Sequence, residues 1–72
     1  MGYSMMTKPG CSYCTRAKAL LKSHNETVAI SDYDTPEKIQ RFKDAGYTTF
    51  PRIFHDGVLV GGYDDLVEYL EF

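Results

Sequence analysis

Residues 8–14 have the sequence KPGCSYC, which places two cysteines three positions apart, directly after a proline and a glycine. Proline and glycine interrupt regular structure, so a short strand over residues 3–7 is expected to end here. Apolar residues recur at helical spacing from Cys14 onward, which predicts a helix from about residue 12 to residue 24. Cys11 therefore ends the loop, and Cys14 lies in the first turn of the helix.

This placement separates the expected roles of the two cysteines. Cys11 lies where unpaired backbone N–H groups and the positive end of the helix dipole favour an anion, so the pKa of its thiol is expected to be lowered. Cys14 shares the apolar stripe with Ala17 and Leu21 and is expected to be buried and less acidic. An exposed, acidic thiol attacks a disulfide, and a neighbour three residues later can resolve the product.

Other readings of the cysteine pair are weaker. A structural zinc site needs four ligands, and His24 and His55 stand alone without ligand spacing. Covalent haem attachment needs a histidine after the second cysteine, where Thr15 stands. Two inert core cysteines remain an alternative, because free cysteine is often buried. We therefore expect a redox pair and no resident metal.

The composition predicts one domain over residues 1–72, with 43% hydrophobic and 25% charged residues. A net charge of −2 without a run of basic residues argues against nucleic acid or a membrane surface as the main partner. No apolar stretch approaches the ~20 residues that cross a membrane, and no signal peptide is apparent. A disulfide between two closely spaced cysteines would add little stability to the fold, so the pair does not resemble the structural disulfides of secreted proteins. This favours a cytoplasmic protein.

The remaining sequence predicts the order β-α-β-α-β-β-α. Two strands that flank the first helix should be parallel, and an Asp-Gly pair predicts a tight antiparallel hairpin. We expect a four-stranded mixed sheet with helices on both faces. The further elements are a strand at residues 28–30, a helix from Thr35 to Ala45, strands at residues 52–55 and 58–60, and a last helix capped by Asp64.

Three segments, taken in order, resemble the dithiol glutaredoxins. They are residues 8–14 followed by Ala17-Lys18, the Thr-Phe-Pro segment at residues 49–51, and the Gly-Gly-Tyr-Asp-Asp-Leu segment at residues 61–66. The resemblance spans nearly the whole chain and implies an α/β thioredoxin-like fold. It also implies glutathione as the reductant and co-substrate.

The resemblance assigns further roles by analogy. Pro51 would follow a cis peptide bond and face the cysteines, although a strand-start proline is the plainer reading. The backbone of Phe50 would pair with the cysteinyl part of glutathione. Backbone N–H groups of Tyr63 and Asp64, with the Asp64 side chain, would hold the γ-glutamyl end. A simple helix N-cap is the alternative role for Asp64.

The glycyl carboxylate of glutathione should meet a basic residue. Lys8 and Lys38 are the candidates and Arg41 is the fallback, although isolated lysines are usually only solvated. Tyr13 is expected to line the groove, with packing on the loop as its plainer role.

Two residues depart from the family pattern. Ser12 replaces the usual proline, and Phe50 is bulkier than the usual valine. The leading interpretation is a monomeric glutathione–disulfide oxidoreductase that reduces glutathione mixed disulfides and protein disulfides, such as that of ribonucleotide reductase. Ser12 keeps open a dimeric iron–sulfur cluster carrier that uses Cys11 and glutathione. A thioredoxin-like donor served by a reductase is a third interpretation, which the Gly-Gly-Tyr-Asp segment disfavours.

Overall fold

The computed structural model describes residues 2–71 and contains the seven elements in the predicted order. The helices end within one or two residues of their expected positions, and the second strand extends two residues further than predicted. The elements are β1 (Tyr3–Thr7), α1 (Ser12–Ser23), β2 (Val28–Asp32), α2 (Pro36–Asp44), β3 (Arg52–His55), β4 (Val58–Gly61) and α3 (Tyr63–Glu71).

The four strands form one mixed sheet in the order β2-β1-β3-β4. β1 and β2 run parallel on either side of α1 in the chain, and β3 runs antiparallel to both β1 and β4. The hairpin turn has φ values of 52° at Asp56 and 82° at Gly57. Two consecutive positive values are what a two-residue type I′ turn requires, and the Asp-Gly pair tolerates them. The expected fold class is confirmed.

Two helices start as the sequence predicts. The side chain of Cys11 accepts a hydrogen bond from the Cys14 N–H at the start of α1. The Thr35 hydroxyl accepts one from the Lys38 N–H at 3.3 Å, with Pro36 at the first position of α2. Each cap satisfies a backbone donor that the helix itself leaves unpaired.

The start of α3 differs from the prediction. The helix begins at Tyr63, so Asp64 lies inside its first turn instead of at the N-cap. The Asp65 carboxylate accepts the hydrogen bond from the Gly62 N–H at 3.0 Å, as the third residue of a helix does in a capping box. Gly61 has a φ of 126°, and an added Cβ would collide with the Asp65 side chain. Capping is therefore the role of Asp65, and the Asp64 side chain is left for another use.

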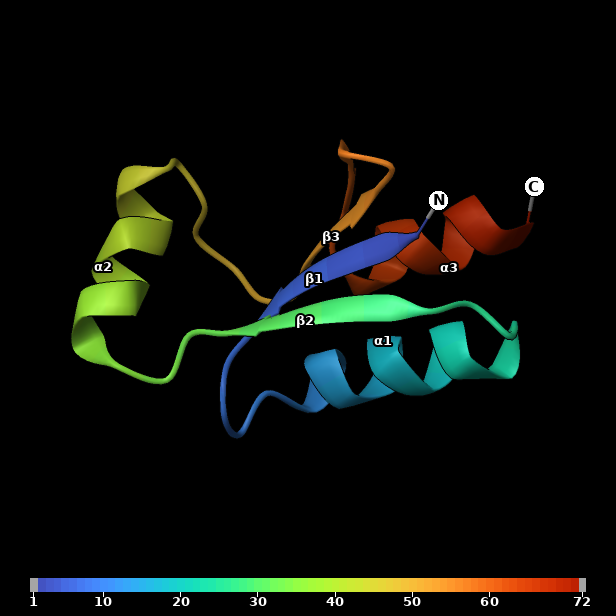
Figure 1. Cartoon of the computed structure of the whole chain (residues 1–72), viewed down its shortest axis with the longest axis horizontal. Helices are drawn as coiled ribbons and strands as arrows, with labels where there is room; N and C mark the ends of the chain where they lie inside the picture. Colours follow the sequence, from blue (N-terminus) through green and yellow to red (C-terminus); the bar gives the residue numbers. More distant parts are fainter. Residues whose placement is uncertain (1, 72) are drawn as a thin grey trace.

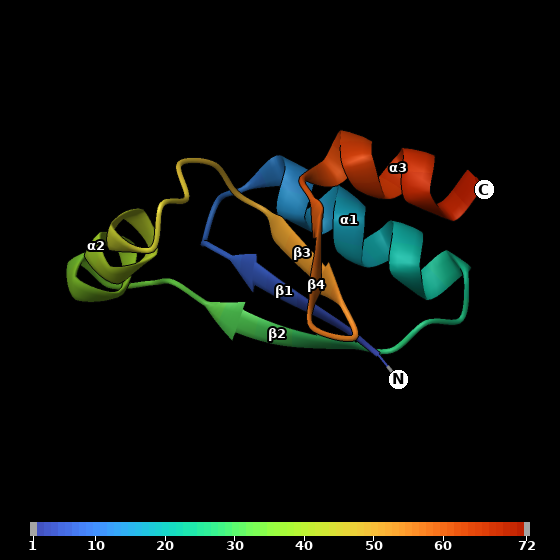
Figure 2. The ribbon, with the colours of Figure 1, turned by 90° about the horizontal axis from the view of Figure 1, so that it is seen from above.

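The core lies between the sheet and the layer formed by α1 and α3, which pack side by side on one face (Figure 2). Because side chains alternate along a strand, Tyr3, Met5 and Thr7 of β1 all point into this core. The buried apolar cluster consists of Tyr3, Met5, Ala17, Leu21, Ile53 and Leu66.

α2 lies beyond the end of the sheet, apart from the other two helices (Figure 1). Aromatic contacts hold α2 in place: the ring of Phe42 stacks on that of Phe50, with 3.9 Å between centroids and 11° between planes. Tyr33 and Tyr47 also contact Phe42, which is only 2% exposed. α2 is therefore anchored to the segment that leads into β3.

In the part of the chain that the structure describes, no helix is long and apolar enough to cross a membrane.

Candidate active site

The two cysteines form a disulfide at the N-terminal end of α1, with their Cα atoms 5.3 Å apart. Cys14 is buried at 2% exposure on the core side of the helix, whereas Cys11 is partly exposed. Both line a cavity of about 480 Å³, which Lys8 and Lys18 also line. Cys14 is thus more buried than Cys11, as predicted.

The start of α1 supplies electrostatic stabilisation to one sulfur in particular. The backbone N–H of Cys14 donates a hydrogen bond to Cys11 Sγ at 3.2 Å. First-turn N–H groups and the helix dipole favour negative charge at the same point. When the disulfide is reduced, this environment stabilises the thiolate form of Cys11. Cys14 Sγ, on the buried side of the helix, receives no comparable stabilisation.

A second cavity, of about 300 Å³, forms a groove from three segments that are distant in the sequence. Tyr13 comes from α1, residues 49–52 lead into β3, and residues 62–65 open α3. The peptide bond between Phe50 and Pro51 is cis, as the resemblance implied. The structure therefore brings together Tyr13, Phe50, Pro51, Tyr63 and Asp64, five of the residues predicted for glutathione binding.

Arg52 is a groove residue that the sequence analysis placed only in a strand. Its Nε donates to the Thr49 carbonyl oxygen at 3.1 Å, and its Nη2 donates to Thr49 Oγ1 at 2.6 Å. A planar guanidinium with two such bonds holds the Thr-Phe-Pro segment in one conformation. The spacing of three residues between Thr49 and Arg52 is the only sequence signal for this contact.

The two acidic residues of the groove have different surroundings. Asp65 is engaged by the Gly62 N–H, as described above. Asp64 is exposed, lines the groove and makes no side-chain hydrogen bond within residues 2–71. A carboxylate in this position is available to pair with a cationic group of a ligand.

The three basic residues considered for the glycyl carboxylate lie in different parts of the structure. Lys8 Nζ lies 5.5 Å from the centroid of the Phe50 ring, next to the groove segment. Lys38 forms an ion pair with Asp34, at 3.2 Å between Nζ and Oδ1, and lines a different cavity together with Arg41. Its hydrogen bond lowers the pKa of the exposed Asp34 carboxyl. Lys8 thus lies beside Phe50 and lines the cysteine cavity without lining the groove, whereas Lys38 and Arg41 line a cavity elsewhere.

Within residues 2–71, no three His, Cys, Asp or Glu side chains are grouped so as to hold a metal ion.

The glutaredoxin family model matches residues 4–60, which make up most of the chain. The match includes the cysteine pair and the cis-proline segment, and it ends before the groove residues 62–65. The chain belongs to the glutaredoxin family. Glutaredoxin 1 of Rickettsia prowazekii is 43% identical over 65 residues, which cover 83% of this chain and 67% of that protein. Glutaredoxin 3 of Escherichia coli is 42% identical over 62 residues, covering 83% and 75%.

Solved glutaredoxin structures have the same fold. The solution structure of glutaredoxin from Brucella melitensis is 39% identical, with a TM-score of 0.78 over 99% of this chain and 79% of that one. Glutaredoxin 1 from Francisella tularensis gives a TM-score of 0.89 over 97% and 92%, at 24% identity. Some glutaredoxins that the chain matches are longer. Mitochondrial glutaredoxin-2 of Pongo abelii is 38% identical over 66 residues, which cover 85% of this chain but only 41% of that protein.

Proposed function

We propose that this glutaredoxin is a glutathione-dependent thiol–disulfide oxidoreductase. One observation carries the proposal: a partly exposed Cys11 is joined to a buried Cys14, and Tyr13 between them lines the groove beside the cis-proline segment. Tyr13 therefore connects the cysteine pair with the groove that we assign to the reductant.

The chemistry follows from this geometry as two thiol–disulfide exchanges. The Cys11 thiolate attacks a disulfide, forms a mixed disulfide with one half and releases the other half as a thiolate. For a glutathione mixed disulfide, Cys11 takes up the glutathionyl group, and the thiolate of a second glutathione releases it as glutathione disulfide. For a protein disulfide, the Cys14 thiolate attacks Cys11 Sγ, which frees the reduced protein and restores the Cys11–Cys14 disulfide.

Glutathione as the reductant is supported by the polar groups of the groove. The N-terminal N–H groups of α3 suit the γ-glutamyl carboxylate, and Asp64 suits its ammonium group. Lys8, beside Phe50, is the residue that we assign to the glycyl carboxylate. A buckwheat glutaredoxin that has been solved as a glutathione complex is 26% identical, with a TM-score of 0.80 over 96% of this chain.

We propose that the protein acts as a monomer in the cytoplasm. Its proposed substrates are glutathionylated proteins and protein disulfides, including that of ribonucleotide reductase. Ser12 is the one observation that favours the alternative, a dimer in which Cys11 and glutathione hold an iron–sulfur cluster. Visible absorbance of protein purified without oxygen separates the two: the oxidoreductase is colourless, and the cluster carrier is coloured.

The proposal is tested by trapping the first intermediate. Reduced Cys14→Ser protein is mixed with glutathione disulfide, and the product is identified by intact-mass and peptide mass spectrometry. We expect one glutathionyl group, attached to Cys11. Attachment of none, under conditions that oxidise the unmodified chain, would contradict glutathione as the reaction partner.

The pKa of the Cys11 thiol should lie clearly below its ordinary value of about 8.5, because its sulfur accepts the Cys14 N–H bond at the start of α1. The measurement is the rate of alkylation against pH in the Cys14→Ser variant. The reverse variant, Cys11→Ser, reports Cys14 and should show no such lowering. A midpoint for Cys11 at or above the ordinary value would remove the electrostatic basis of the mechanism.

Asp64→Ala and Asp65→Ala form a matched pair that separates glutathione binding from helix capping. Asp64→Ala should raise the apparent KM for glutathione about ten-fold or more, because a charge-assisted contact contributes ~1.5–3 kcal/mol and ~1.4 kcal/mol is a factor of ten. It should leave the melting temperature nearly unchanged. Asp65→Ala removes the bond to the Gly62 N–H and should cost ~1 kcal/mol of folding free energy. An unchanged KM in Asp64→Ala would refute the assignment of Asp64 to the ammonium group.

A further inference from the structure

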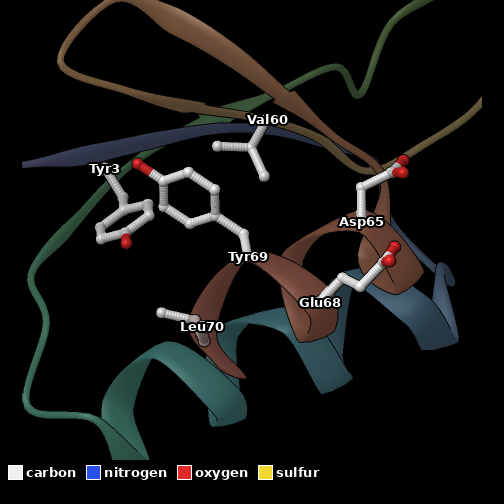
Figure 3. Close-up of a pocket in the computed structure, with 6 residues that line it drawn as sticks. All are labelled: Tyr3, Val60, Asp65, Glu68, Tyr69 and Leu70. Carbon is white, nitrogen blue, oxygen red and sulfur yellow. The ribbon is translucent and has the colours of Figure 1, made fainter. Parts of the chain in front are cut away.

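Among the described residues that line the groove, Arg52 is the only basic one, and no carboxylate of residues 2–71 pairs with it. The Asp65 carboxylate accepts the Gly62 N–H bond and points toward the turn between β4 and α3, as the adjoining cavity in Figure 3 shows. The half-buried guanidinium of Arg52 is held instead by Thr49, through Nε at 3.1 Å and Nη2 at 2.6 Å.

The segment that Arg52 holds, between α2 and β3, is neither helix nor strand. Within residues 2–71, no backbone-to-backbone hydrogen bond involves residues 48–50. Stacking on Phe42 fixes the ring of Phe50, whereas the two bonds from Arg52 fix the carbonyl group and the hydroxyl of Thr49. An irregular segment with so few backbone hydrogen bonds depends on such side-chain contacts to keep one conformation.

Arg52 also lies next to the other wall of the groove. A Cβ added to Gly62 would stand 3.7 Å from Arg52 Nη2 and 3.7 Å from the Pro51 carbonyl oxygen, which is ordinary van der Waals contact. Gly62 is the residue that precedes α3. Because a guanidinium is planar and rigid, Arg52 fixes the position of Thr49 relative to the start of α3.

Glutathione would contact both walls of the groove at once. In the proposed arrangement, the Phe50 backbone pairs with its cysteinyl part, and Asp64 with the start of α3 holds its γ-glutamyl end. A ligand that spans two subsites binds more tightly when their separation is fixed beforehand, because less ordering is needed on binding. We propose that Arg52 is a positioning residue, which gives Cys11 a preference for glutathionyl substrates by holding Thr49 in place. The inference rests on the proposed function and deepens it.

Two disulfide substrates test the inference. The parent protein is reduced Cys14→Ser, in which Cys11 is the one remaining cysteine. Its thiolate attacks glutathione disulfide, forms a mixed disulfide with one glutathionyl group and releases the other as glutathione thiolate. Hydroxyethyl disulfide reacts in the same way but carries no charged group for the groove. The ratio of the two second-order rate constants therefore measures recognition by the groove, because a change in the reactivity of Cys11 affects both.

Arg52→Lys is the informative variant, because it keeps the positive charge and loses the planar pair of donors. In this variant the ratio should fall about five-fold, which corresponds to about 1 kcal/mol at ~1.4 kcal/mol for each factor of ten. Arg41→Lys makes the same chemical change at a residue that lines a cavity elsewhere, and it should keep the ratio of the parent.

Substitution of Thr49 shows whether Arg52 acts through it. Thr49→Val removes the hydroxyl that accepts the Nη2 bond and should lower the ratio about three-fold, since the bond to the carbonyl oxygen remains. Thr49→Ser keeps a hydroxyl and should restore the ratio. In the double variant of Arg52→Lys and Thr49→Val, the loss should be clearly smaller than the product of the two single losses, because both remove the same interaction.

Three results would overturn the inference while the parent keeps its preference for glutathione disulfide. The first is an unchanged ratio in Arg52→Lys, with or without a lower melting temperature, which would leave only a charge or a structural role. The second is an equal fall in Arg41→Lys. The third is a double variant whose loss equals the product, which would mean that Arg52 does not act through Thr49. A ratio near one in the parent itself would instead contradict glutathione as the reaction partner, and the inference with it.

Discussion

Cys11→Ser should abolish turnover of every disulfide substrate. The substitution removes the attacking thiolate, and a serine hydroxyl is a far poorer nucleophile near neutral pH. The disulfide with Cys14 is lost as well, but a thiol on the buried side of α1 cannot take over the attack. The measurement is the rate of reduction of a glutathione mixed disulfide and of a protein disulfide, with the fold checked by circular dichroism.

Cys14→Ser is the matched variant and should separate the two substrates. Reduction of a glutathione mixed disulfide needs only Cys11 and should survive. Reduction of a protein disulfide should slow, and a covalent enzyme–substrate adduct should accumulate, because intramolecular attack by Cys14 competes with external thiol at a high effective concentration. Equal loss of both activities in a folded Cys14→Ser protein would show that the attacking and resolving roles are assigned wrongly.

Phe42→Ala should strongly lower the stability of the protein. Phe42 is 2% exposed and stacks on Phe50, and α2 has no other anchor of comparable size. Truncation of a buried phenylalanine costs about 3–5 kcal/mol. That is a large part of the roughly 4–11 kcal/mol expected for a domain of this length. The free energy of unfolding, measured in urea, should fall accordingly.

A loss below about 1 kcal/mol in Phe42→Ala would show that the aromatic cluster does not hold α2. Val58→Ala is the control, because Val58 is 70% exposed and its truncation should change stability by less than ~0.5 kcal/mol. The variant also affects the site, because Phe50 loses its stacking partner. We therefore expect the KM for glutathione to rise in the fraction that remains folded.

Local signals in the sequence predicted most of the fold. The order of elements, the α2 cap at Thr35 and the Asp56–Gly57 turn are all decided by neighbouring residues, and the structure confirms them. The position of α2 was not predictable in this way. It depends on the contact between Phe42 and Phe50, and side-chain periodicity indicates only that Phe42 is buried.

The same distinction between local signals and contacts made by the folded chain applies to the candidate site. Helical spacing predicted a buried Cys14 beside a partly exposed Cys11. The cis bond before Pro51 came from the family resemblance, since most bonds to proline are trans. The roles of Arg52 and Asp65 were missed because each depends on the local backbone path. Lys38 was a candidate because the family resemblance calls for a basic residue at the glycyl carboxylate, whereas the structure pairs it with Asp34 and places it in a different cavity.

The most direct test of glutathione dependence compares two sources of electrons for one glutathionylated substrate. Oxidation of NADPH is followed with reduced glutathione and glutathione reductase in one reaction and with thioredoxin reductase, without glutathione, in the other. We expect turnover that depends on this chain and on Cys11 in the first reaction, and only background oxidation in the second. Turnover with thioredoxin reductase alone, and none with glutathione, would contradict the account.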